Sequence, residues 1–241
     1  MSDPQKSSPA PLEPADATTP DTVREGVVIA LRPIGSPTSI GLYGLGAASW
    51  TLAGLQLGWI PAAQGKSVAV VLMGFAFIAQ LLASVFAFIG RDGTVGTAMG
   101  VLSLTWLVIG LVLHSSPPGT TSDALGMFLL FSGTAMVLVG ITASTNKLVV
   151  ASVFGLAAIR FIVAGGYELS GSTGWERLSG ALGVALVLLA LYTAFGAGLE
   201  DALGRTVLPL GRHGEGKVAM QGGLLDQVSR VTTEPGVRTK L

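Results

Sequence analysis

Six long apolar segments, separated by short polar connections, constrain the fold of this chain more than any other feature. They cover about residues 40–60, 67–90, 94–114, 124–143, 148–167 and 178–199. A helix needs about 20 apolar residues to cross the roughly 30 Å of hydrocarbon in a bilayer. Backbone groups in hydrocarbon must be hydrogen-bonded within the protein, and these segments lack the alternation of transmembrane strands. The pattern predicts an all-α membrane protein in which six transmembrane helices form one bundle.

The composition agrees with a membrane protein and excludes several other classes. Only 12% of the 241 residues are charged, whereas a soluble domain has about 25%. The chain has no Cys and two His, which excludes thiolate metal sites and His clusters. Its net charge of zero provides no basic surface for nucleic acid. We therefore expect no nucleic-acid partner, no cytosolic enzyme, and no metal or organic cofactor.

The two ends of the chain differ from its apolar middle. Residues 1–35 are rich in Pro, Ser, Thr and Asp, and residues 212–241 are polar and Gly-rich, so we interpret both as disordered tails. Six spans place both tails on one side, together with the connections that hold Arg91 and Lys147. The opposite side carries only Lys66 and Arg177. This excess of Lys and Arg predicts a multi-pass protein of the cell membrane with cytoplasmic N- and C-termini.

Arg160 and Gln80 stand out among the polar residues of the apolar segments, and each allows two interpretations. Arg160 lies in the fifth segment, where a charge costs about 2.5–3.5 kcal/mol at the helix centre. Its side chain either reaches the bilayer interface or faces a wet cavity and attracts an anion, and Glu168 on nearly the same helix face would weaken that attraction. Gln80 lies in the second segment. It either forms an interhelical hydrogen bond or lies on a permeation path.

Acidic residues give no sign of catalysis. Glu200 and Asp201 are adjacent at the end of the sixth segment, and Arg205 follows Asp201 by one helical turn. This spacing predicts a local ion pair at a helix end. The sequence contains no nucleophile elbow, P-loop or metal motif, so we do not expect an enzyme.

Two stretches of the chain resemble the acetate uptake transporter family. The segment YTAFGAGLEDALGRTVLPLG (192–211) ends in a sequence like the family's closing signature, and SPTSIGLYGLG (36–46) resembles the Asn-Pro-Ala-Pro-Leu-Gly-Leu motif of its first helix. Ile78-Ala79-Gln80 and Thr94-Val95-Gly96 also fit. The resemblance covers about residues 36–211, the predicted transmembrane transporter domain.

The resemblance implies an architecture and an activity. In this family six helices surround a pathway within each protomer, and protomers assemble into a homohexamer. The pathway passes acetate and related small monocarboxylates, either by proton symport or as an anion channel. The implied partners of the chain are therefore a small carboxylate substrate, protons if transport is coupled, the lipid bilayer and further copies of the chain.

The family's pathway narrows at three residues, and this chain differs at two of them. The positions correspond to Leu45, Ser103 and Leu156, where the family has Phe, Tyr and Leu. Replacing Tyr with Ser removes bulk, which predicts a wider or wetter gate, because polarity and width control passage through an apolar constriction. Arg160 follows Leu156 by one helical turn and shares its face, so it would lie on the same pathway, on the extracellular side of the gate.

The opening motif also departs from the family, with Ser36 and Ser39 in place of Asn and the second Pro. Ser36, Pro37, Ser39 and Gly41 lie at the start of the first helix, at the predicted cytoplasmic mouth. They either cap the helix or leave its free N–H groups to bind a carboxylate. The altered motif and gate also allow two other functions on the same scaffold, a non-transporting membrane sensor or adaptor and an exporter of ammonia or another small neutral solute.

Overall fold

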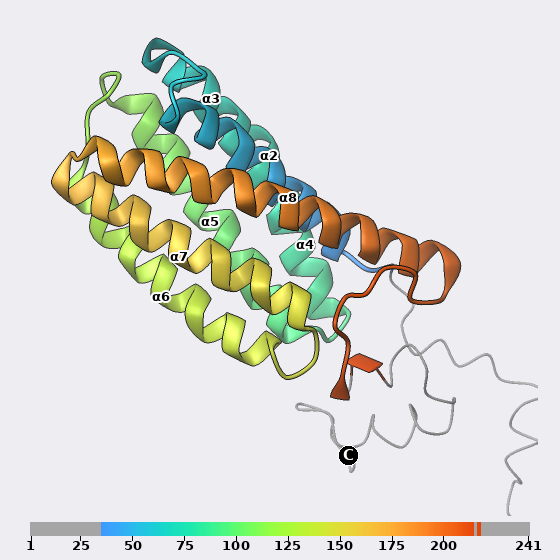
Figure 1. Ribbon diagram of the computed structural model, residues 1–241. Coiled ribbons are helices and arrows are strands. Elements are labelled where there is room, and N and C mark those ends of the chain that lie inside the picture. Colours follow the sequence, from blue (N-terminus) through green and yellow to red (C-terminus); the bar gives the residue numbers. More distant parts are fainter. Residues whose placement is uncertain (1–34, 215, 218–241) are drawn as a thin grey trace, which may run out of the picture. The chain divides into compact units, whose positions relative to one another are not determined.

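The computed structural model describes residues 35–214, 216 and 217, and the chain there is helical (Figure 1). The long helices are α2 (Thr38–Gln56), α5 (Gly93–Ser115), α6 (Asp123–Ala143), α7 (Leu148–Ser170) and α8 (Thr173–Leu203). A further rod consists of the short 3₁₀ helix η1 (Ala62–Gln64), α3 (Gly65–Val71), the π-helical turn η2 (Leu72–Phe77) and α4 (Ile78–Ile89). Strand pairing in the described part is limited to one isolated bridge between Lys147 and Arg212.

The predicted all-α class is confirmed, and the described helices agree in part with the predicted spans. Five helices are long and apolar enough to cross a membrane: the rod Ala62–Ile89, then α5, α6, α7 and α8. The sixth, α2, covers the first predicted span, but four of its 19 residues are Gly and several others are Ser or Thr. The six-span count therefore stays a prediction. The predicted disorder of residues 1–34 and 218–241 lies outside the described residues.

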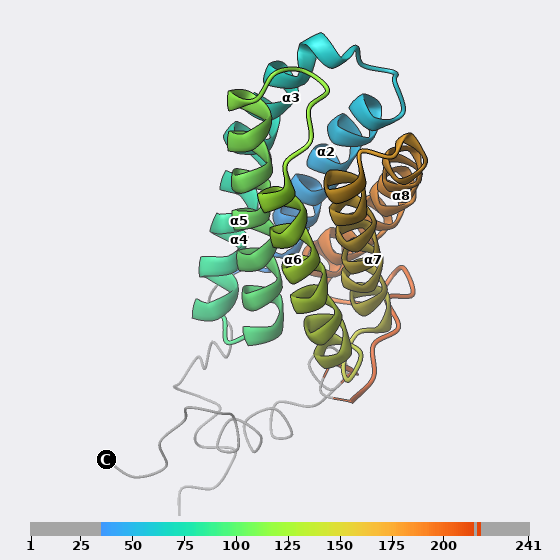
Figure 2. The ribbon, with the colours of Figure 1, turned by 90° about the vertical axis from the view of Figure 1, so that its left-hand side faces the viewer.

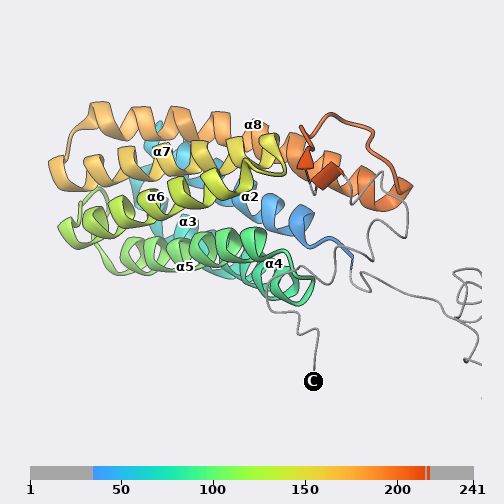
Figure 3. The same ribbon diagram turned by 90° about the horizontal axis from the view of Figure 1, so that it is seen from below.

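Small residues allow α2 to pack closely against its neighbours at the centre of the bundle. It contacts α3, α4, α5 and α8, and the long helices run side by side (Figures 2 and 3). A Cβ atom at Gly41 would lie 2.6 Å from Met99 Sδ and 2.9 Å from Ala83 Cβ, so only glycine permits this approach. In a lipid bilayer the hydrophobic effect does not drive helices together, so close van der Waals contact between backbones stabilises their association instead. The small residues that lower the hydropathy of α2 thus provide its close contacts with neighbouring helices.

The connections separate into two ends of the bundle (Figure 1). We call the end with the start of α2 and the end of α8 the terminal end, and the opposite end the distal end. The distal end holds the α2–η1, α5–α6 and α7–α8 connections, whereas the α4–α5 and α6–α7 connections lie at the terminal end. The predicted orientation places the terminal end in the cytoplasm.

The chain after α8 folds back onto the bundle at the terminal end. Gly204, with a positive φ of 62°, ends the helix, and residues 205–214 return toward the start of α7. There the carbonyl oxygens of Gly211 and Leu210 accept hydrogen bonds from Leu148 N and Val149 N. These bonds satisfy N–H groups that the first turn of a helix leaves free. Residues 212–214, predicted as the beginning of a disordered tail, are therefore ordered against α7.

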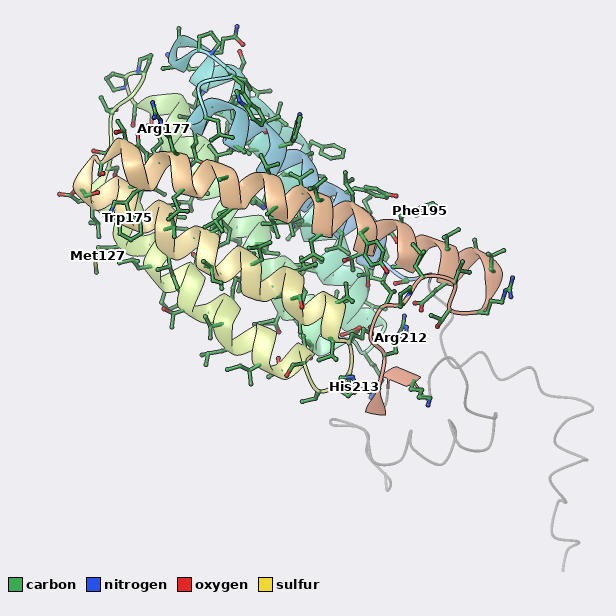
Figure 4. The ribbon with its side chains drawn as sticks, viewed as in Figure 1. Met127, Trp175, Arg177, Phe195, Arg212 and His213 are labelled. Atoms are coloured by element: carbon green, nitrogen blue, oxygen red, sulfur yellow. The ribbon has the colours of Figure 1, made fainter. Side chains whose placement is uncertain are left out.

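The predicted ion pair of Asp201 with Arg205 is wrong. Asp201 instead accepts a hydrogen bond from Ser36 N at 3.4 Å, and Arg205 is exposed. Glu200, 4% exposed, pairs with Arg212, whose Nε lies 2.9 Å from both carboxylate oxygens (Figure 4 labels Arg212). Helical spacing favoured the near partner, but the chain reversal at Gly204 brings the more distant arginine to the buried carboxylate.

Arg212→Gln should therefore destabilise the protein, because it leaves the Glu200 carboxylate buried without its cation. We expect a loss of about 3 kcal/mol in the free energy of unfolding, measured by denaturation of the purified protein in detergent. The matched control is Arg205→Gln, which removes an exposed positive charge from the same segment. Equal stability of the two variants would contradict the assigned role of the ion pair.

Candidate functional site

A cavity of about 100 Å³ extends into the bundle from the distal end, among α2, α5, α6, α7 and α8. Its deep part is lined by Leu52, Ile109, Leu129, Phe161 and Arg160. Its outer part is lined by residues 116, 117, 119 and 120 of the α5–α6 connection and by Tyr167, Glu168 and Glu176 near the facing ends of α7 and α8. An apolar wall with a few polar groups is typical of small-molecule sites.

Arg160 forms the charged floor of this cavity. The residue is 1% exposed, and its Nη1 donates to Ser49 Oγ at 2.7 Å, which joins α7 to α2. Nη2 lies 3.5 Å from Ser49 O, and the guanidinium carbon lies 5.7 Å from the centre of the Trp106 ring. Of the two interpretations of Arg160, the structure therefore agrees with the cavity and not with a side chain that reaches the bilayer interface.

No carboxylate within the described ranges forms an ion pair with Arg160. The ion pairs there join Lys147 to Asp92 and Arg212 to Glu200. Glu168, which would weaken the attraction for an anion if it neutralised Arg160, instead accepts a hydrogen bond from Ser122 N at 2.8 Å. A guanidinium has five N–H donors and a permanent positive charge. Among the described residues Arg160 bonds to a serine and faces an indole ring, so it has capacity for an anion.

Several residues of this site were missed by sequence reasoning. Ser49, Trp106 and Gly183 contact Arg160 from three other helices, and Ser179 Oγ donates to Gln56 Oε1 at 3.3 Å in the cavity wall. Serine, glycine and tryptophan are ordinary in membrane helices, so no local pattern distinguished them. Gln56 was the one available signal, because it is a strongly polar residue within the first predicted span.

The three predicted constriction residues do not line the cavity. Leu45 is fully buried in the core, and Leu156 is partly buried against it, one turn beyond Arg160 toward the terminal end. Ser103 is also fully buried, and its hydroxyl donates to the carbonyl oxygen of Phe77 at 3.1 Å. Phe77 ends the π-helical turn, where the wider spacing disturbs the backbone hydrogen bonds. The constriction itself stays a prediction.

Gln80 links α4 to α2. Its Nε2 donates to Gly41 O at 3.2 Å, so the expected interhelical hydrogen bond is present. Its Oε1 is buried and has no hydrogen-bond partner among the described residues. The same holds for the indole Nε1 of Trp106. Gln80 does not line the cavity, and its place on a permeation path stays a prediction.

The serines of the opening motif do not cap α2. The N-cap residue is Pro37, and no side chain there accepts a cap hydrogen bond. Ser39 Oγ instead donates to Ala194 O at 3.1 Å, and Ser36 N donates to Asp201, so both residues tie α2 to α8. The Asp201 carboxylate therefore already occupies the neighbourhood of this helix start, the predicted carboxylate-binding mouth.

Comparisons with known proteins agree with this architecture. The chain superposes with a TM-score of 0.67 on a solved structure described as that of the bacterial acetate channel SatP, over 74% of this chain and 99% of the other, at 22% identity. This likeness shows the fold. No protein-family model matches the chain. The chain is thus a multi-pass, all-helical membrane protein with the fold of a known channel.

Three relatives are also similar to this chain in sequence. The ammonia transport outward protein 2 of Saccharomyces cerevisiae is 25% identical over 72% of this chain. The match spans only 65% of the length of that relative. The acetate transporter protein patA of Aspergillus clavatus is 26% identical over 72% of this chain and 76% of its own length. An uncharacterized protein of Methanothermobacter thermautotrophicus is 27% identical over 78% of this chain and 96% of its own length. Together with the shared fold, these relatives confirm the resemblance to the acetate uptake transporter family.

Gly183→Ala should disturb the site directly. A Cβ atom at this position would lie 3.0 Å from both Cζ and Nε of Arg160 and 3.0 Å from Ala53 Cβ. We expect overpacking to cost about 1–3 kcal/mol in the free energy of unfolding. Gly155→Ala, on α7 with no atom within 4 Å of the added methyl, is the control. Equal stability of both variants, measured in detergent, would mean that Arg160 is not packed as described.

Proposed function

We propose that the chain is a membrane transporter or channel for acetate or a similar small monocarboxylate. The observation that carries the proposal is Arg160, a buried cation at the floor of a cavity that opens at the distal end, without a carboxylate partner among the described residues. The same position explains why a costly charge is present in a membrane helix.

Electrostatics supports an anion as the missing partner. A buried charge loses most of its hydration, and the cost is offset only by partners of opposite charge and by hydrogen bonds. Ser49 and the Trp106 ring supply part of that compensation to Arg160. A small carboxylate entering the cavity would supply the rest, and a fixed positive charge raises the local concentration of anions. The cavity volume of about 100 Å³ favours a small solute.

The relatives support the substrate class. One is named an acetate transporter, and the solved structure with the same fold is titled an acetate channel. On this proposal the pathway continues from Arg160 past the predicted constriction of Leu45, Ser103 and Leu156 to the terminal end. Gln80 lies along it, and Ser36, Pro37, Ser39 and Gly41 form the cytoplasmic mouth. Six spans, cytoplasmic termini in the cell membrane, a homohexamer and coupling to protons belong to the same proposal.

Ammonia export is the second candidate function, because one relative carries that activity in its name. Arg160 would repel ammonium ions but would let neutral ammonia pass, so the two candidates differ in their response to a change at this residue. A non-transporting sensor or adaptor is the third candidate, and it predicts no flux of either solute.

Arg160→Gln should lower the uptake of labelled acetate into proteoliposomes at least about tenfold, because the attraction of a buried cation for the anion is lost. The control is Arg177→Gln, which removes an exposed positive charge from the distal end outside the cavity lining (Figure 4). Leu156→Trp serves as a blocked pathway, and comparison with and without a proton gradient separates symport from channel.

Wild-type uptake by a folded Arg160→Gln protein would reject the assigned role of this residue. If the wild-type protein passes ammonia but no acetate, the second candidate replaces the first. The absence of both fluxes from a folded wild-type protein would favour the sensor or adaptor.

A further inference from the structure

We propose that Glu168 and Glu176 form an acidic selectivity filter at the mouth of the Arg160 cavity, which admits singly charged carboxylates and rejects dicarboxylates. The inference rests on the proposed function and adds the residues that set its preference for singly charged substrates. It starts from the juxtaposition of two carboxylates and one cation in a single cavity.

The two carboxylates lie between the distal surface and Arg160. Glu168 follows Arg160 by two helical turns on α7, about 12 Å of rise toward the distal end. Glu176 is in the first turn of α8, the helix that follows. Both are partly buried and line the same cavity that Arg160 closes at its deep end. An anion that approaches Arg160 from the distal side through this cavity therefore passes them first.

The charges of the lining set the selectivity. Among the described lining residues, Arg160 is the one cation, Glu168 and Glu176 are the carboxylates, and Tyr167 is the remaining titratable group. Asp123, Arg177, Lys66 and His114 lie on neighbouring distal segments outside the lining. A dianion meets twice the repulsion of a monoanion at the mouth, and Arg160 compensates only one of its charges. The partly dehydrated wall screens these interactions less than water does.

Both acids also have structural partners, so the filter must be distinguished from a purely structural role. Glu168 accepts the Ser122 N–H bond through one oxygen, a bond that a neutral amide oxygen would also accept. Glu176 lies at the positive end of the α8 dipole, accepts a hydrogen bond from the Tyr167 hydroxyl and interacts with the charge of Arg177. Its side chain also lines the cavity. A purely structural role predicts a change in stability on substitution with Gln. A filter predicts a change in the ratio between anions of different charge.

The test compares malonate with malonamate, which has the same shape but one charge fewer. Both are used at about pH 8, where carboxyl groups are fully ionised. Their inhibition of labelled acetate uptake is measured in the wild type and in the Glu168→Gln/Glu176→Gln variant. We expect malonamate to inhibit the wild type at a concentration about tenfold or more below that of malonate. The double variant should lose most of this preference.

Asp123→Asn is the matched control, since it removes an exposed carboxylate from the distal end outside the cavity lining. It should keep the wild-type preference. Equal inhibition of the wild type by the two anions, or a preference that survives in the double variant, overturns the filter.

A second measurement separates this inference from the proposed function. Thermal stabilisation of the purified wild type and double variant by malonate and malonamate reports binding without transport. If acetate uptake is absent but malonamate stabilises the wild type more than malonate does, and the double variant does not discriminate, then the filter stands and the transport proposal fails. Equal stabilisation of the wild type by both anions overturns the filter even when acetate is transported.

Discussion

The burial of the Arg160 charge is the constraint on which the centre of this structure depends. The guanidinium is held by Ser49 of α2, faces the Trp106 ring of α5 and fits against Gly183 of α8. A charge inside a membrane protein requires hydrogen bonds and a polar space around it. Four helices meet that requirement together, and the cavity at the distal end is the space that they leave. Contacts from four helices and the candidate site therefore meet at one residue.

Helix α2 shows how close packing and hydrogen bonds between helices stabilise the bundle in the absence of a hydrophobic effect between them. Its glycines admit the side chains of α4 and α5, and the carbonyl oxygen of Gly41 accepts the Gln80 amide. Its serines bind α7 and α8 through Arg160 and Ala194. Polar atoms that would be costly in lipid thus become the contacts between helices. The same small and polar residues distinguish α2 from the five segments that are long and apolar enough to cross a membrane.

The closing signature is one of the two stretches that resemble the acetate uptake transporter family, and it packs against the bundle at the terminal end. Gly204 reverses the chain, Leu210 is buried, and the carbonyl oxygens of Leu210 and Gly211 complete the first turn of α7. Glu200, which precedes the signature, fixes Arg212, which follows it. This segment joins the last helix to the start of the helix that carries Arg160.

The sequence by itself determined the helical class and the positions of the apolar segments, because both depend on hydropathy along a contiguous stretch. It also indicated Arg160 as a candidate site residue, because a charge within an apolar segment is costly. Tertiary structure decided the partners. Arg160 contacts Ser49 and Trp106, and Glu168 accepts a hydrogen bond from Ser122. The ion pair at the end of α8 joins Glu200 to Arg212, whereas the spacing predicts one between Asp201 and Arg205. These contacts join residues of different helices or cross a chain reversal. Local spacing gives no information on them, since they depend on how the helices pack against one another and on where the chain reverses.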